Sequence, residues 1–162
     1  MTRALPIRPL TAEAFAPFGQ VISTENAAHY PINAGMTERF HDLAAIELAG
    51  DNPRPLISIF RGQPYALPLP LTLVERHPLG SQAFMPLADA DWLVIVAPDE
   101  SGAPGTPIPF RPAPGQGVNI ARNVWHGVLT PLTRPADFLV IDRGGDGVNL
   151  EEYTYSEPWM IG

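Results

Sequence analysis

The sequence predicts a mainly β protein: a single antiparallel β-barrel with one short helix near the N-terminus. Two observations favour this fold class. Twenty prolines and fourteen glycines are too many for a helical bundle, because proline removes an amide donor and breaks helix interiors. The chain is nevertheless 45% hydrophobic, which supplies a core and excludes a disordered proline-rich segment. With 162 residues, residues 1–162 are expected to form one domain.

The N-terminal part holds the predicted helix. Residues 4–9 are expected to form an opening strand. Thr11 is a suitable N-cap for a helix that has Glu13 in its first turn, reaches Phe18 and ends at Gly19.

The rest of the chain is predicted to be extended, with loops between short strands. Residues 20–23 are expected to be extended and 26–35 to form a loop. Residues 37–48 are ambiguous, because the first half alternates like a strand and the second half is compatible with a helix. Short runs bounded by turn residues then predict strands at 55–61, 65–69, 71–77, 81–87, 91–97, 106–111, 117–120, 127–132 and 137–142.

The charge and cysteine content exclude several classes of function. The net charge is −7 and the sequence pI about 4.9, so nucleic acid and anionic membranes would be repelled. The sequence has no cysteine, which excludes disulfides and thiolate metal sites. No apolar run suits a signal peptide or a membrane span, so a cytoplasmic protein is expected.

A first polar segment begins where the strand predicted at 71–77 ends. Side chains alternate along a strand, so Glu75 and His77 share one face. After a tight turn, Gln82 would lie on the same side of the next strand. These three side chains either line a cavity at the mouth of the barrel or form the solvated end of a hairpin.

A second polar segment follows about forty residues later and contains His126 beside Trp125. A histidine next to a large aromatic residue is often a core histidine with its hydrogen bonds satisfied, and it can equally form a pocket wall. Together with the first segment it indicates a pocket lined by Glu75, His77, Gln82 and His126.

This layout resembles the cupin superfamily, in which a histidine-bearing hairpin and a later histidine strand converge inside a small barrel. Arg76 stands where a second histidine would help, and Gln82 stands near the usual glutamate. His77 and His126 with a neutral amide would bind a divalent ion weakly unless Glu75 joins them. The residues leave the need for a metal open.

Several strings of the sequence are specific enough to narrow this resemblance, and they are 75–84, 117–119, 122–126 and 137–145, together with Asn33, Gly35, 38–43, Arg61 and 63–64. They resemble those of the bacterial ureidoglycolate lyase family. This resemblance implies a cupin-like barrel, a homodimer, and the release of urea from ureidoglycolate to give glyoxylate during allantoin breakdown. It also implies a divalent metal, nickel in some descriptions.

The chemistry needs a base for the hydroxyl proton, an acid for the departing urea nitrogen and a cation for the substrate carboxylate. His77 and His126 are candidates for moving protons or holding a metal, and Glu75 is a candidate base or orienting group. Gln82 and Asn119 could bind the urea group. The arginine candidates for the carboxylate are Arg122, Arg61 and Arg76, although alternation makes Arg76 point away from His77. Arg39 and His41 form a further polar pair, which is either a solvated edge or a substrate-binding group that reaches the pocket as a lid or from a dimer partner.

Two other functions stay open on the sequence alone. The chain could be a metal-dependent cupin of another class, such as a dioxygenase or an isomerase. It could also be a non-catalytic cupin that binds a small anion, because one fold hosts many functions.

Overall fold

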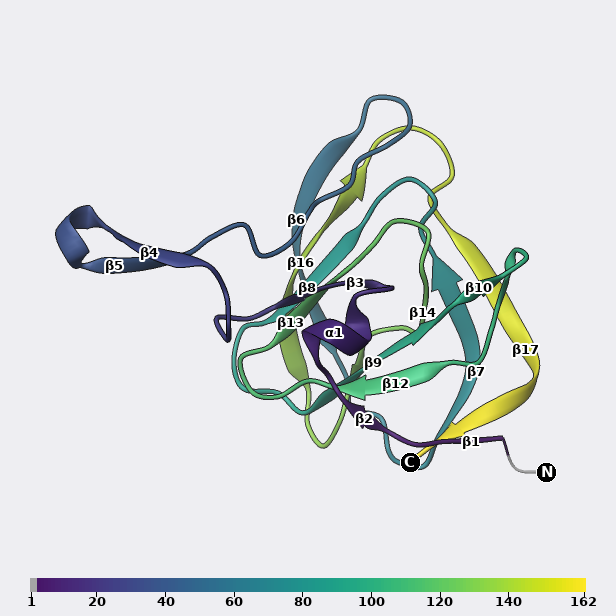
Figure 1. The fold of residues 1–162 in the computed structure, drawn as a ribbon. Coiled ribbons are helices and arrows are strands. Elements are labelled where there is room, and N and C mark those ends of the chain that lie inside the picture. Colours follow the sequence, from purple (N-terminus) through teal and green to yellow (C-terminus); the bar gives the residue numbers. More distant parts are fainter. Residues whose placement is uncertain (1–2) are drawn as a thin grey trace.

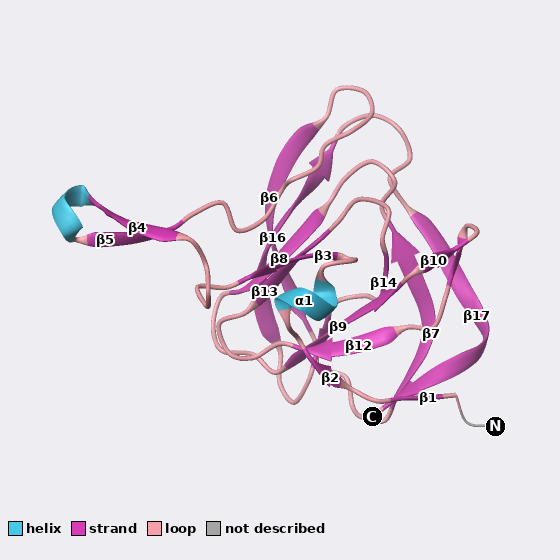
Figure 2. Ribbon diagram, viewed as in Figure 1, coloured by secondary structure: helices cyan, strands magenta, loops and turns pink. Residues whose placement is uncertain are grey.

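The computed structural model describes residues 3–162, and it confirms a nearly all-β, cupin-like fold. Two curled sheets face each other, and α1 (Ala12–Phe15) lies against one side of them (Figures 1 and 2). The side chain of Thr11 caps α1 by accepting a hydrogen bond from the backbone N–H of Ala14, as its sequence predicted. The regular helix is shorter than expected, because turns replace it before Gly19.

The larger sheet contains the strands that carry Glu75 and His126. Its order is β1-β17-β7-β14-β9-β12-β2, and β15 also pairs with β9. The bounds are β1 Ala4–Leu5, β17 Glu151–Ile161, β7 Leu69–Arg76, β14 Trp125–His126, β9 Trp92–Ala97, β12 Ile108–Arg111, β2 Arg8–Pro9 and β15 Thr130–Pro131.

The second sheet has the order β3-β13-β8-β16-β6 and leaves β6 at its edge. All of its pairs are antiparallel. Its strands are β3 Gly19–Ile22, β13 Gly117–Ile120, β8 Gln82–Pro86, β16 Ala136–Gly144 and β6 Arg54–Gly62.

The core fills the space between the two sheets. Phe84, Val118, Phe138 and Val140 of the second sheet pack with Val96 of β9 and its neighbours. A smaller apolar cluster covers the other side of β9. The interior faces of β8, β16, β9 and β14 are therefore fixed by the apolar residues that alternate along them.

A hairpin arm extends away from the barrel (Figure 1). It consists of β4 (His29–Ile32), the 3₁₀ turn η1 (Asn33–Gly35) and β5 (Thr37–Phe40). The prediction of a loop at 26–35 is therefore wrong, because residues 29–32 form β4. The strand alternative for the start of 37–48 is right, and no helix forms in its second half.

Several other expectations need correction. The strand predicted at 65–69 does not form, because Pro64 and Pro68 cannot donate to a ladder. Tyr65 makes only an isolated bridge to Leu132, and Leu69 is the first residue of β7. The opening strand is divided into β1 and β2, which pair in parallel with β17 and β12 and are thus exceptions to the antiparallel prediction.

Besides β4 and β14, which lie outside the predicted strands, two elements have no counterpart in the sequence-based prediction. The strand β17 is eleven residues long. The other is a small hairpin of β10 (Asp99–Glu100) and β11 (Ala103–Pro104). Within residues 3–162, no helix is long and apolar enough to cross a membrane.

Candidate functional site

Glu75, His77, Gln82 and His126 come together at one end of the space between the sheets. Glu75 on β7 lies directly opposite His126 on β14. The rings of His77 and His126 have centroids 5.1 Å apart, and a Glu75 oxygen lies 3.9 Å from His77 Nε2. We call these four residues the histidine cluster.

Both ring nitrogens of His77 face acceptor atoms. Nδ1 lies 2.9 Å from the carbonyl oxygen of Asn149, which can only accept, so Nδ1 carries a proton. Nε2 lies 3.2 Å from Gln82 Oε1. The Gln82 amide is oriented by Asp142, because its Nε2 donates to Asp142 Oδ2 at 3.2 Å. A proton on His77 Nε2 would therefore complete a chain of hydrogen bonds from Asn149 to Asp142.

His126 presents a free lone pair to the cluster. Its Nδ1 donates to the Gly127 carbonyl at 2.9 Å, which leaves Nε2 without a proton in the neutral ring. Nε2 is buried and has no hydrogen-bond partner among the described residues. Burial lowers the pKa of His126 to about 4, against a smaller opposing effect of the Gly127 hydrogen bond. His126 is thus neutral at physiological pH.

Glu75 is half-buried beside the two rings. Burial raises the pKa of its carboxyl group, the nearby His77 lowers it, and Glu152 adds a smaller increase. A carboxylate with a raised pKa exchanges protons closer to neutral pH than an exposed one, which suits a general base.

The cluster concentrates lone pairs at one point. One donor atom each from Glu75, His77 and His126 lies within 4.8 Å of the others, and Gln82 Oε1 lies beside them. Such an arrangement is stable only if a proton, a polar ligand or a metal ion satisfies the lone pairs. It can therefore move protons or hold a divalent cation.

The arginine candidates do not enter this cluster. Arg61 is exposed and forms a two-pronged ion pair with Asp137. Arg122 donates from Nε to the carbonyl of Pro78, and its backbone N–H donates to Glu47.

Arg76 points to the opposite face of β7, as alternation predicted. Its guanidinium contacts Asp99 and Glu151. It also lies 4.2 Å from the ring centroid of Trp125. Arg143 is buried and donates to three backbone carbonyls, so it does not face the cluster either.

Asn119, Arg39 and His41 also lie away from the cluster. Asn119 faces the opposite side of β13 from the core residues Val118 and Ile120, and its amide donates to Gln20 and to a backbone carbonyl. Arg39 lies on β5 in the hairpin arm, and His41 is the first residue after that strand.

Sequence reasoning missed two residues that support the cluster. Asp142 orients Gln82, and the backbone of Asn149 fixes His77. Alternation along β16 could have identified Asp142, because Phe138 and Val140 on the same face are core residues. No sequence signal predicted the Asn149 carbonyl, since any residue can offer one.

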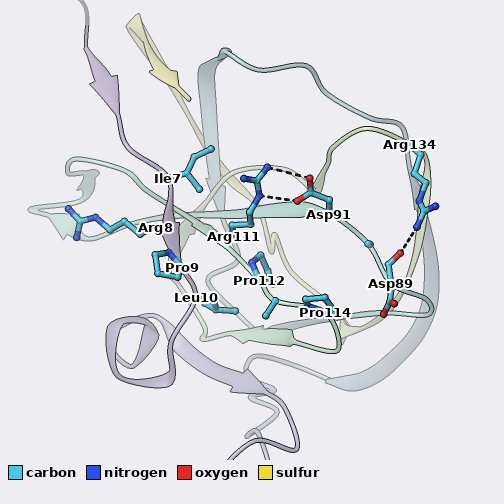
Figure 3. A pocket seen from close by; sticks show the side chains of 12 residues that line it. Ile7, Arg8, Pro9, Leu10, Asp89, Asp91, Arg111, Pro112, Pro114 and Arg134 are labelled. Atoms are coloured by element: carbon cyan, nitrogen blue, oxygen red, sulfur yellow. Dashed lines mark hydrogen bonds and ion pairs between the residues drawn. The ribbon is translucent and has the colours of Figure 1, made fainter.

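A cavity of about 660 Å³ lies at the opposite end of the strands (Figure 3). Asp91 and Arg111 form a two-pronged ion pair in it, and Arg134 donates to the Asp89 backbone. None of its lining residues belongs to the histidine cluster. The convergent lone pairs, rather than the larger hollow, therefore mark the candidate site.

Known proteins of one family are similar to this chain along nearly its whole length. Residues 2–162 match the family model for ureidoglycolate lyase. The chain is 61% identical over 159 residues to "Ureidoglycolate lyase" of Chelativorans sp. (strain BNC1), covering 98% of this chain and 96% of that one. It is 60% identical over 161 residues to "Ureidoglycolate lyase" of Mesorhizobium japonicum (99% and 98% covered), and 58% identical over 157 residues to "Ureidoglycolate lyase 2" of Rhizobium meliloti (97% and 96% covered).

Proposed function

The chain belongs to the ureidoglycolate lyase family, and from this premise we propose that its histidine cluster splits ureidoglycolate into glyoxylate and urea. The observation that carries the assignment of the site is the convergence of Glu75, His77 and His126 donor atoms within 4.8 Å of one another.

The reaction is an elimination that moves one proton from oxygen to nitrogen. The substrate carries a hydroxyl, a carboxylate and a ureido group on one carbon. The hydroxyl loses its proton as the carbon–oxygen double bond of glyoxylate forms. The electron pair of the breaking carbon–nitrogen bond leaves with the ureido nitrogen, which gains a proton to become urea. No water and no covalent enzyme intermediate are needed.

The cluster residues suit these two proton movements. Glu75, whose pKa is raised by burial, takes the hydroxyl proton. His77, with acceptors at both ring nitrogens, is held in the orientation in which Nε2 can deliver a proton to the leaving nitrogen. His126 keeps a lone pair on Nε2 and accepts a hydrogen bond from a ureido N–H of the substrate, which leaves the hydroxyl proton to Glu75.

The same residues fit a divalent cation. Glu75, His77 and His126 would hold it, with the Gln82 oxygen beside them. Both imidazoles donate Nδ1–H to backbone carbonyls, as metal-bound histidines typically do. A bound cation would act as a Lewis acid on the substrate oxygens and lower the pKa of the hydroxyl.

A urea-release assay tests the function. Purified protein is given ureidoglycolate after chelator treatment and again after addition of nickel or manganese, and urea and glyoxylate are both measured. We expect equal amounts of the two products, and His77→Ala should lower kcat by about 10²–10⁴-fold. His29→Ala is the matched control, because that exposed histidine lies on the arm.

The possible outcomes separate the remaining functions. If wild-type protein yields no urea under any of these conditions but binds glyoxylate, the lyase assignment is overturned in favour of a small-anion-binding protein. Normal kcat in His77→Ala would remove this residue from the chemistry.

We also propose that the protein acts as a homodimer in the cytoplasm. The outer face of β6 exposes Ile57 and Ile59, with exposed fractions of 76% and 63%, and Met36 on the arm is 86% exposed. Such apolar exposure next to an uncovered sheet edge favours association of two copies. A chain without cysteine makes no use of an oxidising compartment.

Sedimentation tests the dimer. The double variant Ile57→Lys/Ile59→Lys should sediment as a monomer, whereas Leu87→Lys, at an exposed apolar position just after β8, should not. A wild-type protein that is monomeric at micromolar concentration would contradict this proposal.

A further inference from the structure

The histidine cluster carries negative charge where the proposed substrate is also negative. Glu75 and Asp142 both bring carboxyl groups to it. A substrate carboxylate would be repelled there unless a cation lies close by. A guanidinium is the side chain best suited to this task, because its fork matches a carboxylate.

Most arginines of the chain are engaged elsewhere. Three line the cavity at the opposite end of the strands (Figure 3), and these are Arg8, Arg111 and Arg134. Others are held by ion pairs, backbone carbonyls or aromatic rings, and these are Arg3, Arg39, Arg61, Arg76, Arg122 and Arg143. Arg54 is the remaining one of the ten basic residues.

Strand register places Arg54 at the mouth of the space between the sheets. Phe60, on the same strand, contacts the core residue Phe84, so alternation puts Leu56 and Arg54 on this interior face as well. Leu56 lies directly opposite Asp142 on β16.

Arg54 lies one step nearer the strand end, opposite Gly144. Its Cα is a diagonal neighbour of Asp142, at a separation of about 7–8 Å, which an extended arginine side chain can span. The Leu56 side chain already covers Gly144, with Cδ2 2.9 Å from where a Cβ would be, so the Arg54 side chain must extend past Leu56 along the open rim. Asp142 in turn holds Gln82, which contacts His77, so a guanidinium at this position reaches the rim of the cluster.

We propose that Arg54 binds the carboxylate of the substrate and so determines specificity for 2-oxo and 2-hydroxy acid anions. Arg54 is exposed, and no ion pair among residues 3–162 involves it, so its guanidinium is available to a ligand. Bound there, the carboxylate points the hydroxyl-bearing carbon toward Glu75 and His77. The identity of the substrate rests on the proposed function, but the anion contact does not.

Kinetics and anion binding test this role separately. Arg54→Ala should raise KM by about ten- to a hundredfold, the range expected for losing a hydrogen bond to a charged group, and should change kcat much less because the contact is the same in ground and transition states. Arg54→Lys should give an intermediate KM, since it keeps the charge and loses the fork. Arg8→Ala, an exposed arginine at the opposite end of the strands, should match wild type.

The second readout does not depend on turnover. Glyoxylate should raise the Tm of wild-type protein and of Arg8→Ala, and should have little effect on Arg54→Ala, with circular dichroism confirming that the variant is folded. Equal KM and equal glyoxylate stabilisation in Arg54→Ala and wild type would overturn the proposal. If wild-type protein released no urea, the proposed function would fail, while the Tm comparison would still decide whether Arg54 binds the anion.

Discussion

The buried, neutral state of His126 predicts a measurable loss of stability in mild acid. In the unfolded chain a histidine has a pKa near 6.5, whereas burial lowers the pKa of His126 to about 4 in the folded protein. Between these two values the unfolded chain binds more protons than the folded one. The free energy of unfolding must therefore fall as the pH drops through 6.5 toward 4.

The size of the effect follows from the two pKa values. At pH 5.5 an unfolded histidine is about nine-tenths protonated, and His126 in the folded protein is almost entirely neutral. Protonation favours the unfolded state about tenfold, which corresponds to about 1.4 kcal/mol relative to pH 7.5. At pH 5.5 the protein is still above its sequence pI of about 4.9, so precipitation should not intervene.

The assay compares wild type with His126→Gln, which does not titrate, by guanidinium chloride denaturation at pH 7.5 and 5.5. Urea is avoided as denaturant because it is a product of the proposed reaction, and a chelator removes any metal from His126. The raised pKa of Glu75 acts in the opposite direction, since its folded state binds protons more readily, but Glu75 is present in both proteins. We expect wild type to lose about 1.4 kcal/mol more than the variant. Equal losses in the two proteins would refute the buried neutral state of His126.

Three further predictions concern the cluster and the core. Asp142→Ala should lower kcat with little change in the fold, because it frees the Gln82 amide to rotate. An unchanged kcat in steady-state urea release would show that the orientation of the Gln82 amide is unimportant. Gln82→Glu should tighten binding of a divalent cation by adding a carboxylate beside His77. Calorimetry with nickel on chelator-treated protein measures the affinity, and an affinity equal to that of wild type would mean that the cation does not bind here. Phe138→Ala should lower the free energy of unfolding by about 3–5 kcal/mol, because Phe138 is fully buried and packs against Trp92. A loss below about 1 kcal/mol in chemical denaturation would mean that the core collapses around the gap.

The sequence predicted the local part of the site well. Glu75 lies on β7 and His77 is the first residue after that strand, and the turn after them is short, so alternation alone was enough to put both on the interior side with Gln82. Contacts across long stretches of chain were not predictable in this way. Asp142 is 60 residues from Gln82, and Asn149 is 72 from His77; only the pairing of β16 with β8 brings the first of them close.

The misplaced elements have physical reasons as well. The arm contains Pro31 and mostly exposed, polar residues, so it lacks the apolar alternation that marks a strand packed on a core. β17 is similarly exposed along most of its length. Both are strands because of their pairing partners rather than their own burial, and a single sequence carries little record of pairing.

The candidate site lies where the apolar interior rows of the two sheets end. The interior rows of β8 and β16 are apolar through Phe84 and Val140 and become polar one step later, at Gln82 and Asp142. On the facing sheet, Val96 is a fully buried core residue, and His126 opposite it carries the unsatisfied nitrogen. The apolar rows give rigid positions, and the polar residues at their ends receive the low-dielectric surroundings that lower the pKa of His126 and raise that of Glu75. The proposed chemistry thus depends on this distance from solvent, and substitutions that admit water to the cluster should move both pKa values back toward 6.5 and 4.5 together.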